Sequence, residues 1–198
     1  MASSKKIAPP ADDRRDELLD RIEHTFLREG FRRVTIGELA ARLRCSRRAI
    51  YELASSKEAL FVKILDRVLT RIERMGREAT GGARGVGDKI LAFIEPGLTE
   101  LVDAAPVFFA DIASYPTAER RLRKHQDMRE RELCKLIERG VRDGECRRIH
   151  AEVAAHALLA AYRAITGPAF LSNVDVSLAD AVSEARDLFL FGLLHPED

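Results

Sequence analysis

Two adjacent arginines follow a serine that can begin a helix, in the segment Ser46-Arg47-Arg48-Ala49. Serine is a favoured N-cap residue because its hydroxyl accepts a hydrogen bond from a main-chain N–H of the first turn. A guanidinium group can donate two hydrogen bonds to the O6 and N7 atoms of guanine, and an alanine methyl group can pack on thymine. Because a recognition helix reads base edges with its first turn, this segment predicts contacts in the major groove of DNA.

The preceding residues predict a second short helix that would support this segment. Thr35 and Glu38 have the spacing of a capping box. Ala40 is small enough to let two helices approach closely, and Ile50 is apolar where the second helix must meet the core. The apolar positions at helical spacing are Ile36, Leu39, Ala40 and Leu43. Two short helices joined by a tight turn form a helix-turn-helix.

Other polar side chains nearby could contact the phosphate backbone. Tyr51 and Lys57 could donate hydrogen bonds to phosphate oxygens, which fixes the register without reading the sequence. Ser55 and Ser56 can cap the next helix, and that N-terminus would itself attract phosphate. The candidate DNA-contact residues are Thr35, Arg44, Ser46, Arg47, Arg48, Ala49, Tyr51 and Lys57.

The charge is unevenly distributed, although the net charge of the chain is only +1. Residues 1–57 contain 13 Lys or Arg and 9 Asp or Glu, a net charge of +4, whereas residues 58–198 contain 20 and 23, a net charge of −3. A basic N-terminal part joined to a mildly acidic remainder is typical of a DNA-binding module attached to another domain.

No motif of an enzyme, a cofactor site or a metal site is present. The segment GGARGVGDK lacks the GK[ST] ending of a phosphate-binding loop. Cys45, Cys134 and Cys146 are widely spaced and show no zinc-ligand pattern. Cys45 lies among arginines that could lower its thiol pKa and make it a redox sensor. The alternative, a small apolar residue packed inward, is the ordinary role of a free cysteine.

The ends of the chain predict no targeting segment. Residues 1–11 lack the apolar stretch of a signal peptide, and we expect them to be a disordered tail. Lys5 and Lys6 could alternatively form a basic arm that enters a minor groove. Because no apolar run approaches the ~20 residues that span a bilayer, we expect a cytoplasmic protein without membrane contact.

Residues 58–198 have the apolar spacing of helices throughout. The glycine-rich segment 80–87 predicts a flexible loop, and Pro96-Gly97 should kink or interrupt the helix that contains it. We find no convincing strand pattern and no internal repeat, so the sequence predicts an all-α fold. The expected helices cover about 58–77, 88–104, 106–115, 116–142, 150–166 and 177–194.

The first third of the chain resembles the tetracycline-repressor (TetR) family of bacterial transcription regulators. This resemblance implies about nine helices in total, with a three-helix helix-turn-helix domain at 12–57 and a helical effector-binding and dimerisation domain at 58–198. The matching residues are Gly30-Phe31, Thr35-Ile36, Leu39-Ala40, Ser46, Ile50-Tyr51, Ser56-Lys57-Glu58 and Leu60-Phe61.

Three positions depart from the family pattern. Arg44 stands where glycine is frequent, so a left-handed conformation there would carry a side-chain penalty. Ala54 replaces a common aromatic residue. Glu52 stands where neutral or basic residues are frequent, and it would repel phosphate if it faced DNA.

The resemblance also implies a homodimer through residues 150–194, where small and apolar residues cover both expected helices. The alternative is that these helices complete the core of a monomer. The middle helices would enclose a pocket for a small-molecule effector, although each candidate could instead be an ordinary core residue. The candidates are Phe93, Phe108, Phe109, Tyr115, His125, Met128 and Tyr162. The alternative for His125 is a solvated position on its charged helix, whereas His156 is expected to lie in an interface or the core.

The sequence thus predicts a ligand-responsive transcriptional regulator that binds double-stranded DNA. The resemblance implies a repressor that binds a palindromic operator as a homodimer and is released by an effector. A helical bundle without a DNA function is one alternative, but it gives no reason for the basic N-terminal part. An architectural DNA-binding protein is another, and it would bind all sequences about equally.

Overall fold

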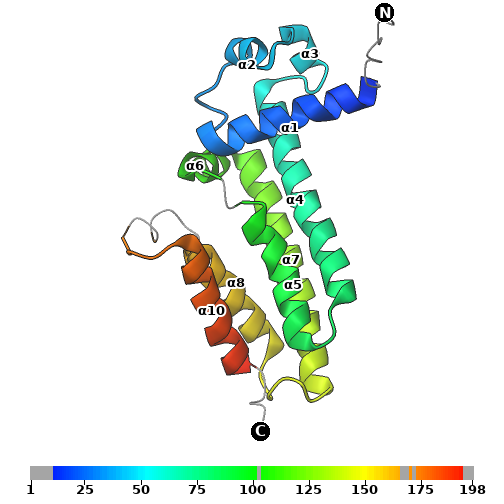
Figure 1. Cartoon of the computed structure of the whole chain (residues 1–198), viewed down its shortest axis with the longest axis vertical. Coiled ribbons are helices and arrows are strands. Elements are labelled where there is room, and N and C mark those ends of the chain that lie inside the picture. Colours follow the sequence, from blue (N-terminus) through cyan, green and yellow to red (C-terminus); the bar gives the residue numbers. More distant parts are fainter. Residues whose placement is uncertain (1–10, 102–103, 166–169, 171–172, 194–198) are drawn as a thin grey trace, which may run out of the picture. The chain divides into compact units, whose positions relative to one another are not determined.

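The computed structural model describes residues 11–101, 104–165, 170 and 173–193, and these contain nine helices and no strand. The expected all-α fold is therefore confirmed (Figure 1). The tail expected at residues 1–11 lies almost entirely outside the described residues. The helices are α1 (Ala11–Glu29), α2 (Ile36–Leu43), α3 (Arg47–Tyr51), α4 (Lys57–Gly82), α5 (Val86–Thr99), α6 (Pro106–Ser114), α7 (Pro116–Arg142), α8 (Ala151–Ile165) and α10 (Leu178–Leu193).

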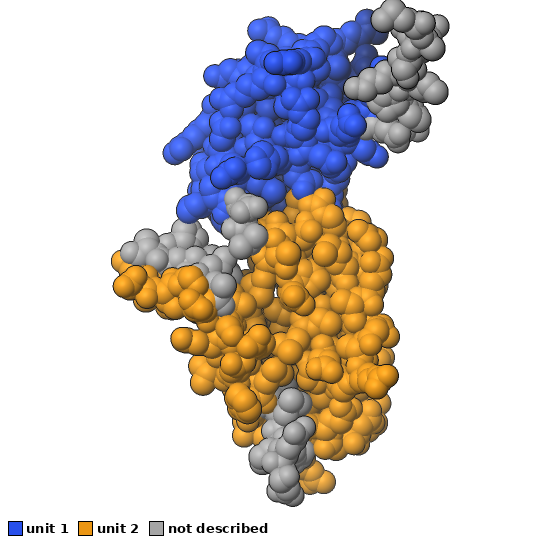
Figure 2. Space-filling view, in the orientation of Figure 1, with its two compact units in different colours: residues 1–67, 103–119 blue, residues 68–102, 120–198 orange. Residues whose placement is uncertain are grey.

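The chain forms two compact units (Figure 2). Unit 1 comprises residues 1–67 and 103–119, and unit 2 comprises residues 68–102 and 120–198. Unit 1 therefore contains α1, α2, α3 and α6, together with the beginnings of α4 and α7. These units are defined by how compactly the residues pack, not by what they bind. The expected boundary between a DNA-binding domain and an effector-binding domain at residues 57 and 58 therefore remains a prediction.

An aromatic cluster forms the centre of unit 1. The rings of Phe31 and Phe61 are stacked, with centroids 4.1 Å apart and an interplanar angle of 12°. Phe26 and Phe108 meet the ring of Phe61 edge to face, at centroid distances of 6.1 and 5.8 Å. All four side chains are buried. Because burial of large aromatic side chains dominates the energetics of small cores, this cluster holds α1, α4 and α6 together.

Gly30 allows the chain to pass close to α6. Its φ angle is +77°, in the left-handed region that favours glycine. Two residues later, the main-chain N–H of Arg32 donates a hydrogen bond to Oδ2 of the buried Asp111 at 3.3 Å. The N–H of Ala105 donates to the carbonyl oxygen of Leu27 at 2.8 Å. Two main-chain contacts therefore join the end of α1 to the region of α6.

Unit 2 has a core of aliphatic side chains from three helices. Ile90 of α5 and Leu133 and Ile137 of α7 are almost completely buried. On α8, Ala155 and Leu158 pack into the same cluster, and α10 packs along α8. The small alanine side chains let α8 approach its neighbours closely.

Two of the expected helix interruptions are wrong. The expected loop at 80–87 shrinks to residues 83–85, because α4 continues through Gly81 and Gly82 and α5 begins at Val86. Glycine costs about 1 kcal/mol inside a helix, which a long helix tolerates in its last turn. Helix α5 also continues through Pro96, so the expected interruption is wrong, whereas the alternative expectation of a kink there remains a prediction.

The close approach at Gly30 gives a test of the unit 1 packing. An added Cβ atom at Gly30 would lie 2.6 Å from Asp111 Oδ2 and 2.8 Å from Val107 Cγ2. Gly30→Ala should therefore lower the free energy of unfolding by about 2–5 kcal/mol, from left-handed strain and overpacking together. Gly144 is the matched control, because its φ is +80° and no atom lies within 4 Å of an added Cβ.

Gly144→Ala should cost only the conformational strain, about 1–2 kcal/mol. Urea unfolding of both variants measures the difference. Equal losses would show that the contact with α6 adds nothing to the cost at Gly30.

Candidate functional site

Helix α2 begins with a complete capping box. The hydroxyl of Thr35 accepts a hydrogen bond from the N–H of Glu38 at 3.2 Å, and the Glu38 carboxylate accepts one from the N–H of Thr35 at 2.7 Å. These hydrogen bonds lower the pKa of the Glu38 carboxyl group. Two unpaired N–H groups of the helix end are satisfied reciprocally. Thr35 therefore has the structural role that the sequence predicts.

Helix α3 begins at the predicted N-cap. The Ser46 hydroxyl accepts a hydrogen bond from the N–H of Ala49 at 3.0 Å. Ile50 is 1% exposed and faces the core, whereas Arg47 and Arg48 are exposed in the first turn. Tyr51 is also exposed. The helix therefore places its basic residues on the surface and its apolar residue inside, as the sequence predicts.

Arg44 adopts the left-handed conformation at the end of α2, with φ 52° and ψ 44°. Its N–H donates to the carbonyl oxygen of Ala41 at 3.3 Å, and the N–H of Cys45 donates to Ala40 at 3.0 Å. Arg21 of α1 donates to the carbonyl oxygen of Leu43 at 3.2 Å. The last carbonyl groups of α2 are thus satisfied, and the contribution of Arg21 was not predicted because it comes from another helix.

The two arginines of α3 have different intramolecular neighbours. Arg48 Nε donates a hydrogen bond to Glu52 Oε1 at 3.0 Å, and the two side chains are 89% and 63% exposed. Arg47 lies over Gly37, where an added Cβ would be 2.9 Å from Arg47 Nη2. Exposed ion pairs contribute little to stability, so Arg48 can exchange Glu52 for another acceptor at small cost.

Lys57 has structural contacts that the sequence did not indicate. Its Nζ donates to the carbonyl oxygens of Val34 and Arg32 at 3.1 and 3.4 Å and lies 5.4 Å from the centroid of the Phe31 ring. The ammonium group therefore supports the segment between α1 and α2. Its predicted contact with phosphate remains a prediction.

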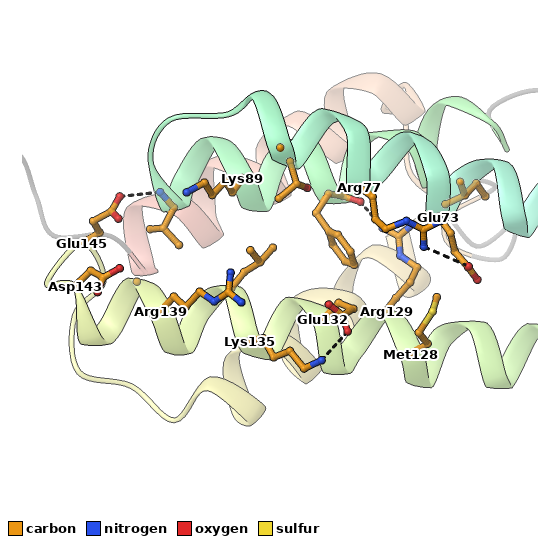
Figure 3. A pocket seen from close by; sticks show the side chains of 17 residues that line it. Glu73, Arg77, Lys89, Met128, Arg129, Glu132, Lys135, Arg139, Asp143 and Glu145 are labelled. Carbon is orange, nitrogen blue, oxygen red and sulfur yellow. Dashed lines mark hydrogen bonds and ion pairs between the residues drawn. The ribbon is translucent and has the colours of Figure 1, made fainter.

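A cavity of about 600 Å³ lies in unit 2, between α4, α5 and α7 (Figure 3). Its walls combine apolar and charged side chains. The apolar ones are Ile72, Val86, Phe93, Met128 and Leu136. The cationic ones are Arg77, Lys89, Arg129, Lys135 and Arg139. The acidic ones are Glu73, Glu132, Asp143 and Glu145. A mixed apolar and polar lining and a volume of this size are usual for small-molecule sites.

The structure brings two of the seven predicted pocket residues, Phe93 and Met128, into the lining of this cavity. Tyr162 is 6% exposed and packs in the core of unit 2. The other predicted residues lie elsewhere: Phe108, Phe109 and Tyr115 belong to unit 1, where Phe108 is fully buried and Tyr115 contacts Phe31. The presence of an aromatic residue in the sequence did not show whether its side chain lines a cavity or packs in a core.

His125 is not solvated, and His156 is not buried as expected. His125 is 8% exposed, and its Nδ1 lies 3.0 Å from Oε1 of Glu73, a residue of the cavity wall. Burial lowers the pKa of His125, Arg129 lowers it further, and the hydrogen bond to Glu73 opposes this. His156 is instead exposed and lies 2.9 Å from Glu130. The direction of each side chain depends on the packing of α7 and α8, which the local sequence does not reveal.

Arg129 is the most constrained cation of the cavity wall. Its Nη2 donates to the carbonyl oxygen of Phe93 at 2.8 Å, and its guanidinium lies 4.7 Å from the centroid of the Phe93 ring. Gly97 leaves room for the same group, because an added Cβ would lie 3.1 Å from Arg129 Nη1. Burial lowers the pKa of Arg129 to about 10, so it stays charged at neutral pH.

The three cysteines are free thiols. Burial raises the pKa of Cys45, although Arg21 opposes this. Burial and neighbouring carboxylates also raise the pKa of Cys134 and Cys146. Because reactive thiols have a lowered pKa, this structure favours the packing role for Cys45 over redox sensing.

Helices α8 and α10 expose large apolar side chains in unit 2. Leu188 and Phe191 of α10 are 76% and 88% exposed, and Val153 of α8 is 62% exposed. These residues fall in the range 150–194 expected to form a dimer, of which residues 166–169, 171, 172 and 194 lie outside the described residues. Exposed apolar groups of this size mark a surface suited to a partner. Within the described part of the chain, no helix is long and apolar enough to cross a bilayer.

Residues 18–64, which lie within unit 1, match the model of the bacterial regulatory proteins of the tetR family. No curated protein matches the chain in sequence. The structure is similar to that of a proposed transcriptional regulator from Saccharomonospora viridis in complex with choline, with a TM-score of 0.78 and 16% identity over 93% of this chain and 99% of that one.

Two further solved structures are similar over nearly the whole chain. The TetR family regulator PfmR of Thermus thermophilus has a TM-score of 0.70 and 22% identity, covering 91% of this chain and 100% of that one. The ketosteroid regulator KstR2 of Mycobacterium tuberculosis has a TM-score of 0.64 and 14% identity, covering 96% and 100%. At these identities the likeness establishes the fold.

The buried His125 should make the stability of the protein depend on pH. Its pKa in the folded state lies below the unfolded value of about 6.5. Above pH 6.5 both states are neutral at this site. As the pH falls below 6.5, the unfolded state binds the proton first, so the free energy of unfolding decreases until the folded pKa is passed.

His125→Gln should therefore reduce the loss of stability between pH 7 and pH 5, measured by urea unfolding at several pH values. His24→Gln is the control, because His24 is exposed. If the wild type and His125→Gln lose stability equally on acidification, then burial of this imidazole is not the cause.

Proposed function

We propose that the chain is a ligand-responsive repressor of the TetR family of bacterial regulatory proteins, an assignment supported by the match of residues 18–64 to the family model and by the similar fold of family members. In this proposal a homodimer binds a palindromic operator through residues 12–57 of each protomer. A small-molecule effector bound within residues 58–198 releases the DNA.

The observation that carries the DNA-binding part is the capped first turn of α3. Arg47 and Arg48 are exposed there, behind an N-cap at Ser46 whose hydrogen bond fixes the start of the helix. A recognition helix contacts bases with these positions. Arg44 and Tyr51 are exposed at either end of the same segment and are suited to phosphate contacts.

Two observations support the proposed dimer: one short recognition helix per protomer, and the exposed apolar side chains of α8 and α10. A single short recognition helix contacts few base pairs, whereas a two-fold dimer reads half-sites about 34 Å apart. Leu188 and Phe191 offer the apolar contacts that such an interface needs.

The position of the cavity supports the proposed effector response. Helix α4 contributes to both compact units, and it supplies Ile72, Glu73 and Arg77 to the cavity wall. An effector can change DNA binding only through different affinities for two states of the protein. A coupling free energy of about 1–3 kcal/mol would change operator affinity roughly 5- to 150-fold.

Fluorescence anisotropy tests the DNA-binding proposal. DNA from just upstream of the coding region should bind at least ~10³-fold more tightly than scrambled DNA, and both affinities should fall steeply with salt. Equal affinity for the two DNAs would favour the architectural alternative. The absence of binding at low salt would overturn the proposal.

Arg48→Ala should reduce the preference for upstream over scrambled DNA by about 1–3 kcal/mol, because a bidentate contact with guanine is lost. Arg142→Ala is the control, an exposed arginine at the end of α7 in unit 2. If Arg48→Ala instead weakens binding to both DNAs by the same factor, Arg48 contacts phosphate and does not read a base.

Phe191→Glu combined with Leu188→Glu should convert the dimer into a monomer, because charge replaces the most exposed apolar groups of α10. Sedimentation velocity at several protein concentrations measures the change. Glu184→Gln, at an exposed polar position of the same helix, should leave the dimer intact. A double variant that remains dimeric would place the interface elsewhere.

A further inference from the structure

We propose that the cavity of unit 2 binds an organic anion with an apolar body, such as a carboxylate or a sulfonate, and discriminates against quaternary ammonium compounds. This inference rests on the proposed function, in which an effector occupies the same cavity. It adds the chemical class of that effector.

Three cations of the cavity wall form no ion pair with any residue that the structure describes, although the charge of Glu73 acts on Arg129. In the part of the chain that the structure describes, no carboxylate forms an ion pair with Lys89, Arg129 or Arg139. The other two cations do have partners: Arg77 lies 3.9 Å from Glu73, and Lys135 lies 2.8 Å from Glu132. Lys89, Arg129 and Arg139, all labelled in Figure 3, therefore have N–H groups that no carboxylate within the described ranges accepts in an ion pair.

The acidic residues of the wall are mostly occupied. Glu73 lies against His125 and Arg77, and Glu132 pairs with Lys135. Glu145 accepts a hydrogen bond from the N–H of Val86 at 2.7 Å. Among the described residues, neither Asp143 nor Glu145 has a cationic partner in an ion pair. The wall contains five cationic and four acidic side chains, so it has a net charge of +1, which an anionic ligand would neutralise.

The aromatic residue of the wall is poorly placed for an ammonium ligand. Quaternary ammonium groups are held against the faces of aromatic rings, commonly several rings together. Phe93 is the aromatic residue among those lining the cavity, and the guanidinium of Arg129 already lies over its ring. A second cation at that ring would meet Arg129 at short range and be repelled. The cavity thus lacks the site that choline-like compounds need.

The remaining lining provides a surface for an apolar body. Ile72, Met128 and Leu136 line the cavity together with the charged residues. A ligand with one anionic group and an apolar part would match both kinds of wall. Charge-assisted hydrogen bonds from guanidinium and ammonium groups would fix the orientation of the anionic group.

The probe for the experiment is 1-anilinonaphthalene-8-sulfonate, with N-phenyl-1-naphthylamine as its neutral counterpart. The two share the same fluorescent ring system and differ by the sulfonate. Titration of the full-length protein should give at least tenfold tighter binding of the sulfonate. Octyltrimethylammonium should compete for this site less well than octanoate, because both have an octyl chain but opposite charges.

Substitutions of cavity residues that form no ion pair test whether the sulfonate probe binds in this cavity. Lys89→Gln and Arg139→Gln should each weaken binding of the sulfonate about tenfold and leave the neutral probe unchanged, since each removes one charge-assisted contact. Asp143→Asn should tighten binding of the sulfonate, because it removes a repulsive charge. Lys124→Gln, an exposed position of α7 outside the cavity lining, is the control and should change neither affinity.

Equal affinity for the two probes, or a preference that Lys89→Gln and Arg139→Gln leave intact, would overturn the proposal. The operator assay separates this failure from failure of the proposed function. Specific DNA binding without a preference for anions would reject only the ligand class. A cavity that prefers anions in a protein that does not bind the operator would retain the ligand class and reject the regulator.

Discussion

The positions of Arg47 and Arg48 depend on how α3 is held against the rest of unit 1, because a helix of this length is not stable by itself. Helix α3 has five residues, whereas isolated helices shorter than about 12–15 residues are marginal in water. Its geometry therefore comes from the burial of Ile50 and Leu53 and from the serine cap. Any contact that α3 makes with DNA therefore depends on this burial and on the cap.

In unit 2 the cavity is lined by charged as well as apolar side chains. Charged groups near a core are stable only if they are paired, solvated or bound to a ligand. Most acidic groups of the wall have partners within the protein, and Arg129 is held by a carbonyl oxygen and an aromatic ring. The cations that form no ion pair are then available to a ligand. Beside the cavity, α5 and α7 are held together by their shared aliphatic core, which includes Ile90, Leu133 and Ile137.

Features fixed by a few neighbouring residues could be predicted from the sequence. The caps at Thr35 and Ser46 and the proline-initiated helices at Pro106 and Pro116 depend on local hydrogen bonds and dihedral angles. Features set by the meeting of distant helices could not. The burial of His125 against Glu73 joins residues 52 positions apart, and nothing in a single helix indicates its partner. The same reason separates Phe93, which lines the cavity, from Phe108, which fills a core.

Arg44 shows how stability and recognition can favour different residues at one position. Its left-handed backbone would be relaxed by glycine, which has no Cβ to clash. Glycine would also remove an exposed positive charge beside α3. If Arg44 contacts phosphate as proposed, selection for stability would favour glycine at this position and selection for DNA affinity would favour arginine.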